Sequence, residues 1–120
     1  MKRVMVVDDA VTMRQMVSFT LKKGGYEVVE AEHGQEALEK LKSVSVDLVI
    51  TDLNMPVMDG ITLIQNLRKM PSMKSKPILM LTTEGMAAKK EQGKAAGATG
   101  WVVKPFDPDK LLQTLAKVLP

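Results

Sequence analysis

Short, uninterrupted apolar runs recur along this chain and constrain its fold more than any other feature. Residues 4–7, 48–50 and 78–81 consist only of valine, isoleucine, leucine and methionine. Such runs are typical of strands that are buried on both faces, as they are in a parallel sheet. Together with two weaker segments they predict five strands, over residues 3–8, 27–31, 46–51, 77–81 and 101–103.

Stretches with apolar residues at helical spacing separate the predicted strands. They predict helices over residues 11–23, 35–42, 61–69 and 86–96, of which the last has the weakest contrast between apolar and polar faces. Asp107 and Pro108 predict the start of a fifth helix, as its N-cap and first helical residue. Because strands and helices alternate, we predict an α/β fold, a doubly wound parallel sheet with helices on both faces.

The composition narrows the class of protein. A chain of 120 residues suits one domain, so we expect a single domain over residues 1–120 without an output domain. The absence of cysteine excludes disulfides and thiolate metal sites. The net charge of +3 is spread along the chain, which favours solvated faces over a nucleic-acid surface. No apolar run is long enough for a signal peptide or a membrane span, so we expect a cytoplasmic protein.

Chemically active side chains stand where the predicted strands end. Asp8 and Asp9 end the first strand, Asp52 the third, Thr82 the fourth and Lys104 the fifth. In open α/β sheets the ligand site lies beyond the carboxyl ends of the strands. Two carboxylates about 4 Å apart repel by roughly 4 kcal/mol at an effective dielectric constant near 20, so the group needs a cation. Oxygen ligands without sulfur or a nearby histidine favour Mg²⁺, with Mn²⁺ as an alternative.

Each of these residues also has an ordinary explanation when it is taken alone. An aspartate pair is usually a solvated turn, Asp52 can cap a helix, and Lys104 can be a surface lysine. Their convergence at one predicted edge is what favours a site. A divalent cation, a lysine and a hydroxyl around a carboxylate suit phosphoryl transfer, in which the carboxylate can become an aspartyl phosphate.

Four segments at these strand ends resemble the motifs of the response-regulator receiver family. They are VMVVDDA at residues 4–10, TDLNMPVMDG at 51–60, LTTEG at 81–85 and VVKPF at 102–106. The resemblance extends over residues 3–119 and is closest to the single-domain chemotaxis members of the family. It implies a flavodoxin-like sheet with strand order 2-1-3-4-5, and a signalling switch that phosphorylation activates.

The resemblance also implies roles for the acidic residues. Asp52 is expected to accept the phosphoryl group from a histidine kinase. Asp9, Asp52 and the backbone carbonyl of Asn54 are expected to bind Mg²⁺ directly, and Asp8 through water. Asn54 and Glu84 occupy positions that tune the phosphate lifetime in the family. His33 is expected to be a turn residue without a role in the chemistry, because the donor histidine belongs to the kinase.

Further roles follow for the residues around the phosphate. Lys104, before an expected cis bond to Pro105, pairs with the phosphate, and Thr82 hydrogen-bonds it and draws its own loop inward. Trp101 occupies the position of the switch aromatic residue, which half-buried packing in the sheet explains nearly as well. Thr83 stands where the family often has a smaller residue, so access to the phosphoryl group is expected to be narrower.

The expected partners are the histidine kinase and a target protein, either the flagellar motor switch protein or another. A monomer is expected to bind this target through the last two helices and the fifth strand. No nucleic acid or membrane is expected to bind. The protein is not expected to be an enzyme beyond its own phosphorylation and dephosphorylation. A phosphorelay intermediate, a phosphate sink and a regulator of another motility system remain open alternatives.

Two other classes of protein fit the sequence less well. A phosphatase of the haloacid-dehalogenase type needs a second aspartate two residues after Asp52, where this chain has Asn54. A flavodoxin needs a first loop rich in hydroxyl groups and glycine, where this chain has Asp8 and Asp9.

Overall fold

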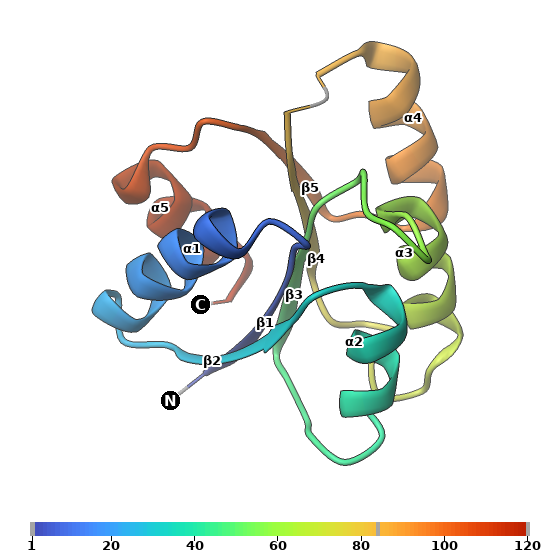
Figure 1. Ribbon diagram of the computed structural model, residues 1–120, viewed down its shortest axis with the longest axis horizontal. Helices are drawn as coiled ribbons and strands as arrows, with labels where there is room; N and C mark the ends of the chain where they lie inside the picture. The colour runs from blue at the N-terminus through green and yellow to red at the C-terminus, as the bar shows by residue number, and fades with distance from the viewer. Residues whose placement is uncertain (1, 84, 120) are drawn as a thin grey trace.

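A five-stranded parallel sheet forms the centre of the protein (Figure 1). The computed structural model describes residues 2–83 and 85–119. The strand order is β2-β1-β3-β4-β5, which confirms the predicted doubly wound α/β fold. The strands are β1 (Arg3–Val7), β2 (Glu27–Ala31), β3 (Leu48–Thr51), β4 (Ile78–Thr82) and β5 (Gly100–Val103), and the helices are α1 (Val11–Lys23), α2 (Gly34–Lys40), α3 (Gly60–Lys69), α4 (Ala87–Ala96) and α5 (Pro108–Val118).

Side-chain alternation along the strands builds a separate apolar core on each face of the sheet. In β1, Val4 and Val6 pack with residues of α1 and α5, whereas Met5 and Val7 pack with residues of α2 and α3. Figure 1 shows the same division, with α1 and α5 on one side of the sheet and α2, α3 and α4 on the other. The central strands are therefore buried on both faces, as their continuous apolar runs predict.

The predicted third strand begins two residues too early, because a side chain takes one of the hydrogen bonds of the pairing there, although the Asp47 N–H still donates to the Arg3 carbonyl at 2.7 Å. The Asp47 carboxylate accepts the main-chain N–H of Arg3 at 2.9 Å, and regular pairing starts only at Leu48. This hydrogen bond also holds the pKa of Asp47 below its ordinary value. The predicted second helix extends two residues too far, because the N–H groups of Lys42 and Ser43 donate to carbonyls only three residues back, at 3.2 and 3.1 Å, as in turns.

The end of β1 is the boundary that matters most for the site. Asp8 still donates its main-chain N–H to the Ala31 carbonyl, at 3.1 Å. Its own carbonyl instead accepts from the Arg14 guanidinium at 2.7 Å. The chain thus leaves the sheet between Asp8 and Asp9, which is where the sequence requires it to leave if both side chains are to share a site.

Side-chain caps fix the start of three helices. Asp107 caps α5 through the N–H groups of Asp109 and Lys110, with Pro108 following it as predicted. Asp59 caps α3, and the His33 imidazole caps α2, a local structural role that agrees with its predicted place before this helix. Among the residues that the structure describes, no helix combines the length and the apolar character needed to cross a bilayer.

Candidate functional site

Strand register brings the predicted site residues to the carboxyl edge of the sheet. Val7 of β1 is paired with Thr51 of β3, so Asp8 and Asp52 leave neighbouring strands at the same level. Thr82 of β4 is paired with Val103 of β5, the residue before Lys104. In addition, the Lys104 N–H donates to the Thr82 carbonyl at 2.7 Å. The four strand ends thus deliver the predicted side chains to one place.

Three carboxylates form the acidic part of this site. Asp8, Asp9 and Asp52 each offer one oxygen, and these oxygens all lie within 4.8 Å of one another. Asp8 is buried, Asp52 is partly buried and Asp9 is exposed. The donor set contains oxygen only, which fits a hard divalent cation. An exposed ligand beside a buried one also fits an ion such as Mg²⁺ that keeps several of its waters.

Lys104 supplies the positive charge of the site. Its Nζ lies 2.8 Å from Oδ2 of Asp8 and 3.5 Å from Oδ2 of Asp52. The side chains of Lys104, Asp8 and Asp52 are only 8%, 5% and 12% exposed, so water screens this group of charges weakly. The peptide bond between Lys104 and Pro105 is cis, as expected.

Main-chain hydrogen bonds orient Asp52 and the residue that follows it. The Leu53 N–H donates to Oδ1 of Asp52 at 2.8 Å, and the Asp52 N–H donates to the Val7 carbonyl at 3.0 Å. The N–H of Gly60, at the start of α3, donates to the Leu53 carbonyl at 2.7 Å. A Cβ atom on Gly60 would overlap the main-chain oxygen of Asp52, so this close approach requires glycine. With Oδ1 engaged by Leu53, Oδ2 is the oxygen that faces Lys104.

Trp101 packs on the α2, α3 and α4 side of the sheet and is half-buried. Its indole lies against Gly93 in the middle of α4, where a Cβ atom would be 2.6 Å from Cζ3 of the ring. Glycine in α4 therefore provides the space that the indole fills.

The other predicted site residues differ in burial. Thr82 is fully buried, whereas Thr83 and Asn54 are exposed. Glu84 lies outside the described residues.

Two features of the site region were missed at the level of sequence. Arg14 reaches the main chain of Asp8 from α1, and no local motif distinguishes it from other helical arginines. Val57, in the loop after Asp52, has a φ angle of +72°, which is rare for a β-branched residue. Pro56 and Asp59 predict a turn here, but they do not predict that a valine in this turn adopts the left-handed backbone conformation.

Comparison with known proteins decides the family. The family model of the response regulator receiver domain matches residues 4–116. The chain belongs to this family.

This receiver domain closely resembles CheY chemotaxis proteins. It is 44% identical to chemotaxis protein CheY1 of Helicobacter pylori, with 98% of this chain and 96% of that protein covered. It is 41% identical to CheY of Bacillus subtilis, with 98% and 97% covered. A solved structure of CheY4 from Vibrio cholerae is 52% identical, with a TM-score of 0.96 and 99% of both chains covered. The receiver resemblance that the four motifs suggested is confirmed.

The buried ion pair of this receiver domain can be tested by removing its lysine. Lys104→Met leaves the Asp8 carboxylate buried and unpaired beside two others, and should lower the free energy of unfolding by about 3 kcal/mol. Urea unfolding without divalent cations measures the change. Lys42→Met is the matched control, since Lys42 lies 3.0 Å from Glu39 in an exposed pair and should change stability by less than about 0.5 kcal/mol. Equal effects of the two substitutions would contradict the buried pair.

Proposed function

We propose that this protein is a phosphorylation-activated response regulator that works in the cytoplasm, with residues 1–120 as its receiver domain. Asp52 accepts a phosphoryl group from a histidine kinase, and the phosphorylated form binds a target protein. The observation that carries the proposal is the position of the Asp52 carboxylate, which has oxygens of Asp8 and Asp9 within 4.8 Å and the Lys104 ammonium 3.5 Å from its Oδ2. This arrangement suits a nucleophile whose product carries additional negative charge.

A Mg²⁺ ion completes this site in the proposal. The oxygen-only donor set supports it, as does the charge of the cluster, because Lys104 compensates only one of the three carboxylates. Asp9, Asp52 and the backbone carbonyl of Asn54 hold the ion directly, and Asp8 holds it through water. When bound, the ion offsets the negative charge of the carboxylates and of the phosphoryl oxygens. Mn²⁺ can take the same ligands.

The chain's own residues position the transfer. Oδ2 of Asp52 forms the new bond to phosphorus, while the bond from phosphorus to the donor histidine nitrogen breaks and the imidazole leaves with the electron pair. The Leu53 N–H holds Oδ1 of Asp52 and so presents Oδ2. The ammonium of Lys104 and the hydroxyl of Thr82 then stabilise the phosphoryl oxygens. The protein catalyses in this way only its own phosphorylation and dephosphorylation.

Chemotaxis is the pathway that the relatives favour. CheY proteins at 41% and 44% identity, aligned over nearly the whole of both chains, support a target in the flagellar motor switch. The target surface of the monomer consists of α4, β5 and α5. Trp101 lies in β5, and the cis peptide at Lys104 follows directly after this strand. A role as a phosphorelay intermediate is the alternative, and genomic neighbours would separate the two.

The assignment of Asp52 can be tested by intact mass. Incubation with a small-molecule phosphodonor and Mg²⁺ should add a single phosphoryl group to the wild-type protein. Asp52→Asn should add none, because it removes the carboxylate oxygen that lies 3.5 Å from Lys104 and that the Leu53 N–H leaves available for attack. Asp59→Asn is the control, because Asp59 is an exposed cap of α3 and should leave the uptake unchanged. Uptake by Asp52→Asn at the wild-type rate and stoichiometry would remove Asp52 as the acceptor.

The switch can be followed through Trp101, the only tryptophan in the chain. Phosphorylation should change its emission, because a phosphate that draws the Thr82 hydroxyl inward shifts the connection from β4 to α4, the helix against which the indole packs. Thr82→Ala should still accept the phosphoryl group but lose most of the emission change, since a ligand shifts two states only through its different affinity for them. Thr83→Ala, which removes the exposed neighbouring hydroxyl, should respond like the wild type. A full response in Thr82→Ala would limit Trp101 to packing the sheet.

A further inference from the structure

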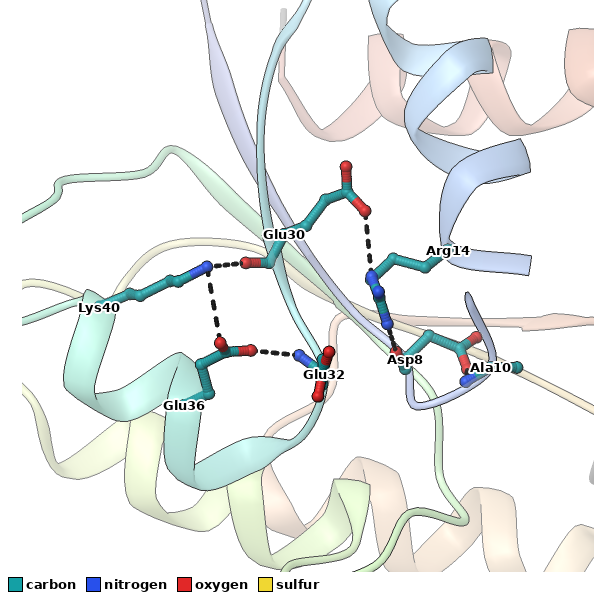
Figure 2. A network of polar contacts seen from close by, with 7 residues as sticks. All are labelled: Asp8, Ala10, Arg14, Glu30, Glu32, Glu36 and Lys40. Carbon is teal, nitrogen blue, oxygen red and sulfur yellow. Dashed lines mark hydrogen bonds and ion pairs between the residues drawn. The ribbon is translucent and has the colours of Figure 1, made fainter. Parts of the chain in front are cut away.

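Arg14 connects helix α1 to the main chain of the acidic pair (Figure 2). Its Nη1 donates to the Asp8 carbonyl at 2.7 Å, and its Nε donates to the Glu30 carboxylate at 3.0 Å. The guanidinium side chain is only 10% exposed, whereas most arginines lie on the surface. Two fixed hydrogen bonds from a planar, buried group define the position of the Asp8 carbonyl closely.

Glu30 is itself held in place by α2, as Figure 2 shows. Its main-chain carbonyl accepts from Nζ of Lys40, which lies 3.9 Å from the Glu36 carboxylate. Glu36 in turn accepts the main-chain N–H of Glu32. The main chain of Glu30 is therefore fixed to a helix at the end of β2, and from this anchored position its partly exposed carboxylate reaches Arg14.

The Asp8 carbonyl lies at the point where the two acidic side chains become able to share a site. Adjacent residues of a strand point to opposite faces, so Asp8 and Asp9 converge only because the chain turns between them. The Ala10 N–H closes this turn by donating to Oδ1 of Asp8 at 2.9 Å. Arg14 fixes the other side of the same residue, and the direction in which the chain leaves Asp8 sets where the Asp9 carboxylate lies.

We propose that Arg14, held by Glu30, is a positioning residue of the acidic metal site. The inference rests on the proposed function, in which Asp9 and Asp52 bind a divalent cation, and it adds a residue that touches neither the ion nor the phosphate. Residues that orient metal ligands from behind typically change the metal affinity by tenfold or more when they are removed.

The sign of the effect separates positioning from simple charge. Arg14 carries a positive charge next to Asp8 and so repels a cation bound at the acidic site. By Coulomb forces alone, its removal should therefore tighten the binding of a cation. If Arg14 instead positions the acidic pair, its removal should weaken that binding. A role in packing alone would lower the stability and leave the affinity of the folded protein unchanged.

The experiment is a titration with Mn²⁺, in which electron paramagnetic resonance measures the free ion and Mg²⁺ is added as a competitor. Arg14→Met removes the charge and the hydrogen bonds but keeps the aliphatic volume, and should weaken Mn²⁺ binding about tenfold. Arg14→Lys keeps the charge but loses the planar guanidinium, and should also weaken binding, by a smaller factor. Thermal melts confirm that the protein titrated is folded.

Arg3 offers a closely matched control. It also donates through Nε to a glutamate of β2, Glu27, at 2.9 Å, and through Nη1 to a main-chain carbonyl, that of Ser45, at 3.2 Å. It stands at the opposite end of β1 and is 41% exposed. Arg3→Met should therefore leave the affinity for Mn²⁺ at the wild-type value.

Each outcome decides the inference. Weaker binding in Arg14→Met and Arg14→Lys, with a normal affinity in Arg3→Met, supports it. Tighter or unchanged binding in Arg14→Met overturns it, and if that variant does not fold, a wild-type affinity in Arg14→Lys overturns it equally. If the wild-type protein binds no Mn²⁺, or binds only Mn²⁺ that Mg²⁺ does not displace, the proposed metal site and this inference are overturned together. Unchanged Arg14 variants beside a normal wild type would leave the proposed function standing.

Discussion

Repulsion among like charges is the constraint on which the rest of this structure depends. The register of β1 and β3 places Asp8 and Asp52 side by side, and the turn after Asp8 adds Asp9, so three carboxylates share one edge of the sheet. Lys104 is the one ammonium that contacts this cluster among the described ion pairs. Two negative charges remain uncompensated, and a divalent cation carries a charge of the same magnitude and the opposite sign. The fold can hold such a cluster because the central strands are buried on both faces, and this burial fixes the positions of their ends.

Much of this arrangement is predictable from the amino-acid sequence, for a physical reason. Buried parallel strands need continuous apolar runs, and parallel strands deliver their last residues to the same edge, so the apolar runs are enough to place Asp8 and Asp52 at a common site. The ends of strands and helices are predicted least accurately. At Asp47, for example, a side-chain carboxylate accepts the Arg3 N–H in place of a main-chain carbonyl, and local sequence patterns do not show such a substitution.

Other parts of the site depend on contacts between distant segments, which local patterns do not encode. Arg14 is one of several polar residues on α1. Its hydrogen bond to the Asp8 carbonyl becomes apparent only when α1 is packed on the sheet beside Glu30. From the sequence alone, Gly93 is a residue that destabilises helix α4, and its packing against Trp101 is seen only in the folded structure. Val57 takes a positive φ angle against its own preference, so its residue type predicts the opposite. Such departures from local preference lie around the site, where function outweighs local stability.

The central claim is that this acidic cluster is completed by a divalent cation, and the stability of the wild-type protein tests it most directly. Unfolding should be measured over a range of Mg²⁺ concentrations at constant ionic strength. A ligand that binds only the folded protein adds about 2.7 kcal/mol at a hundred times its dissociation constant, so the free energy of unfolding should rise continuously with Mg²⁺. The increase should be absent in Asp9→Asn, which removes the exposed carboxylate and leaves the pair between Asp8 and Lys104 intact. A stability independent of Mg²⁺, or the same increase in Asp9→Asn, would contradict the account.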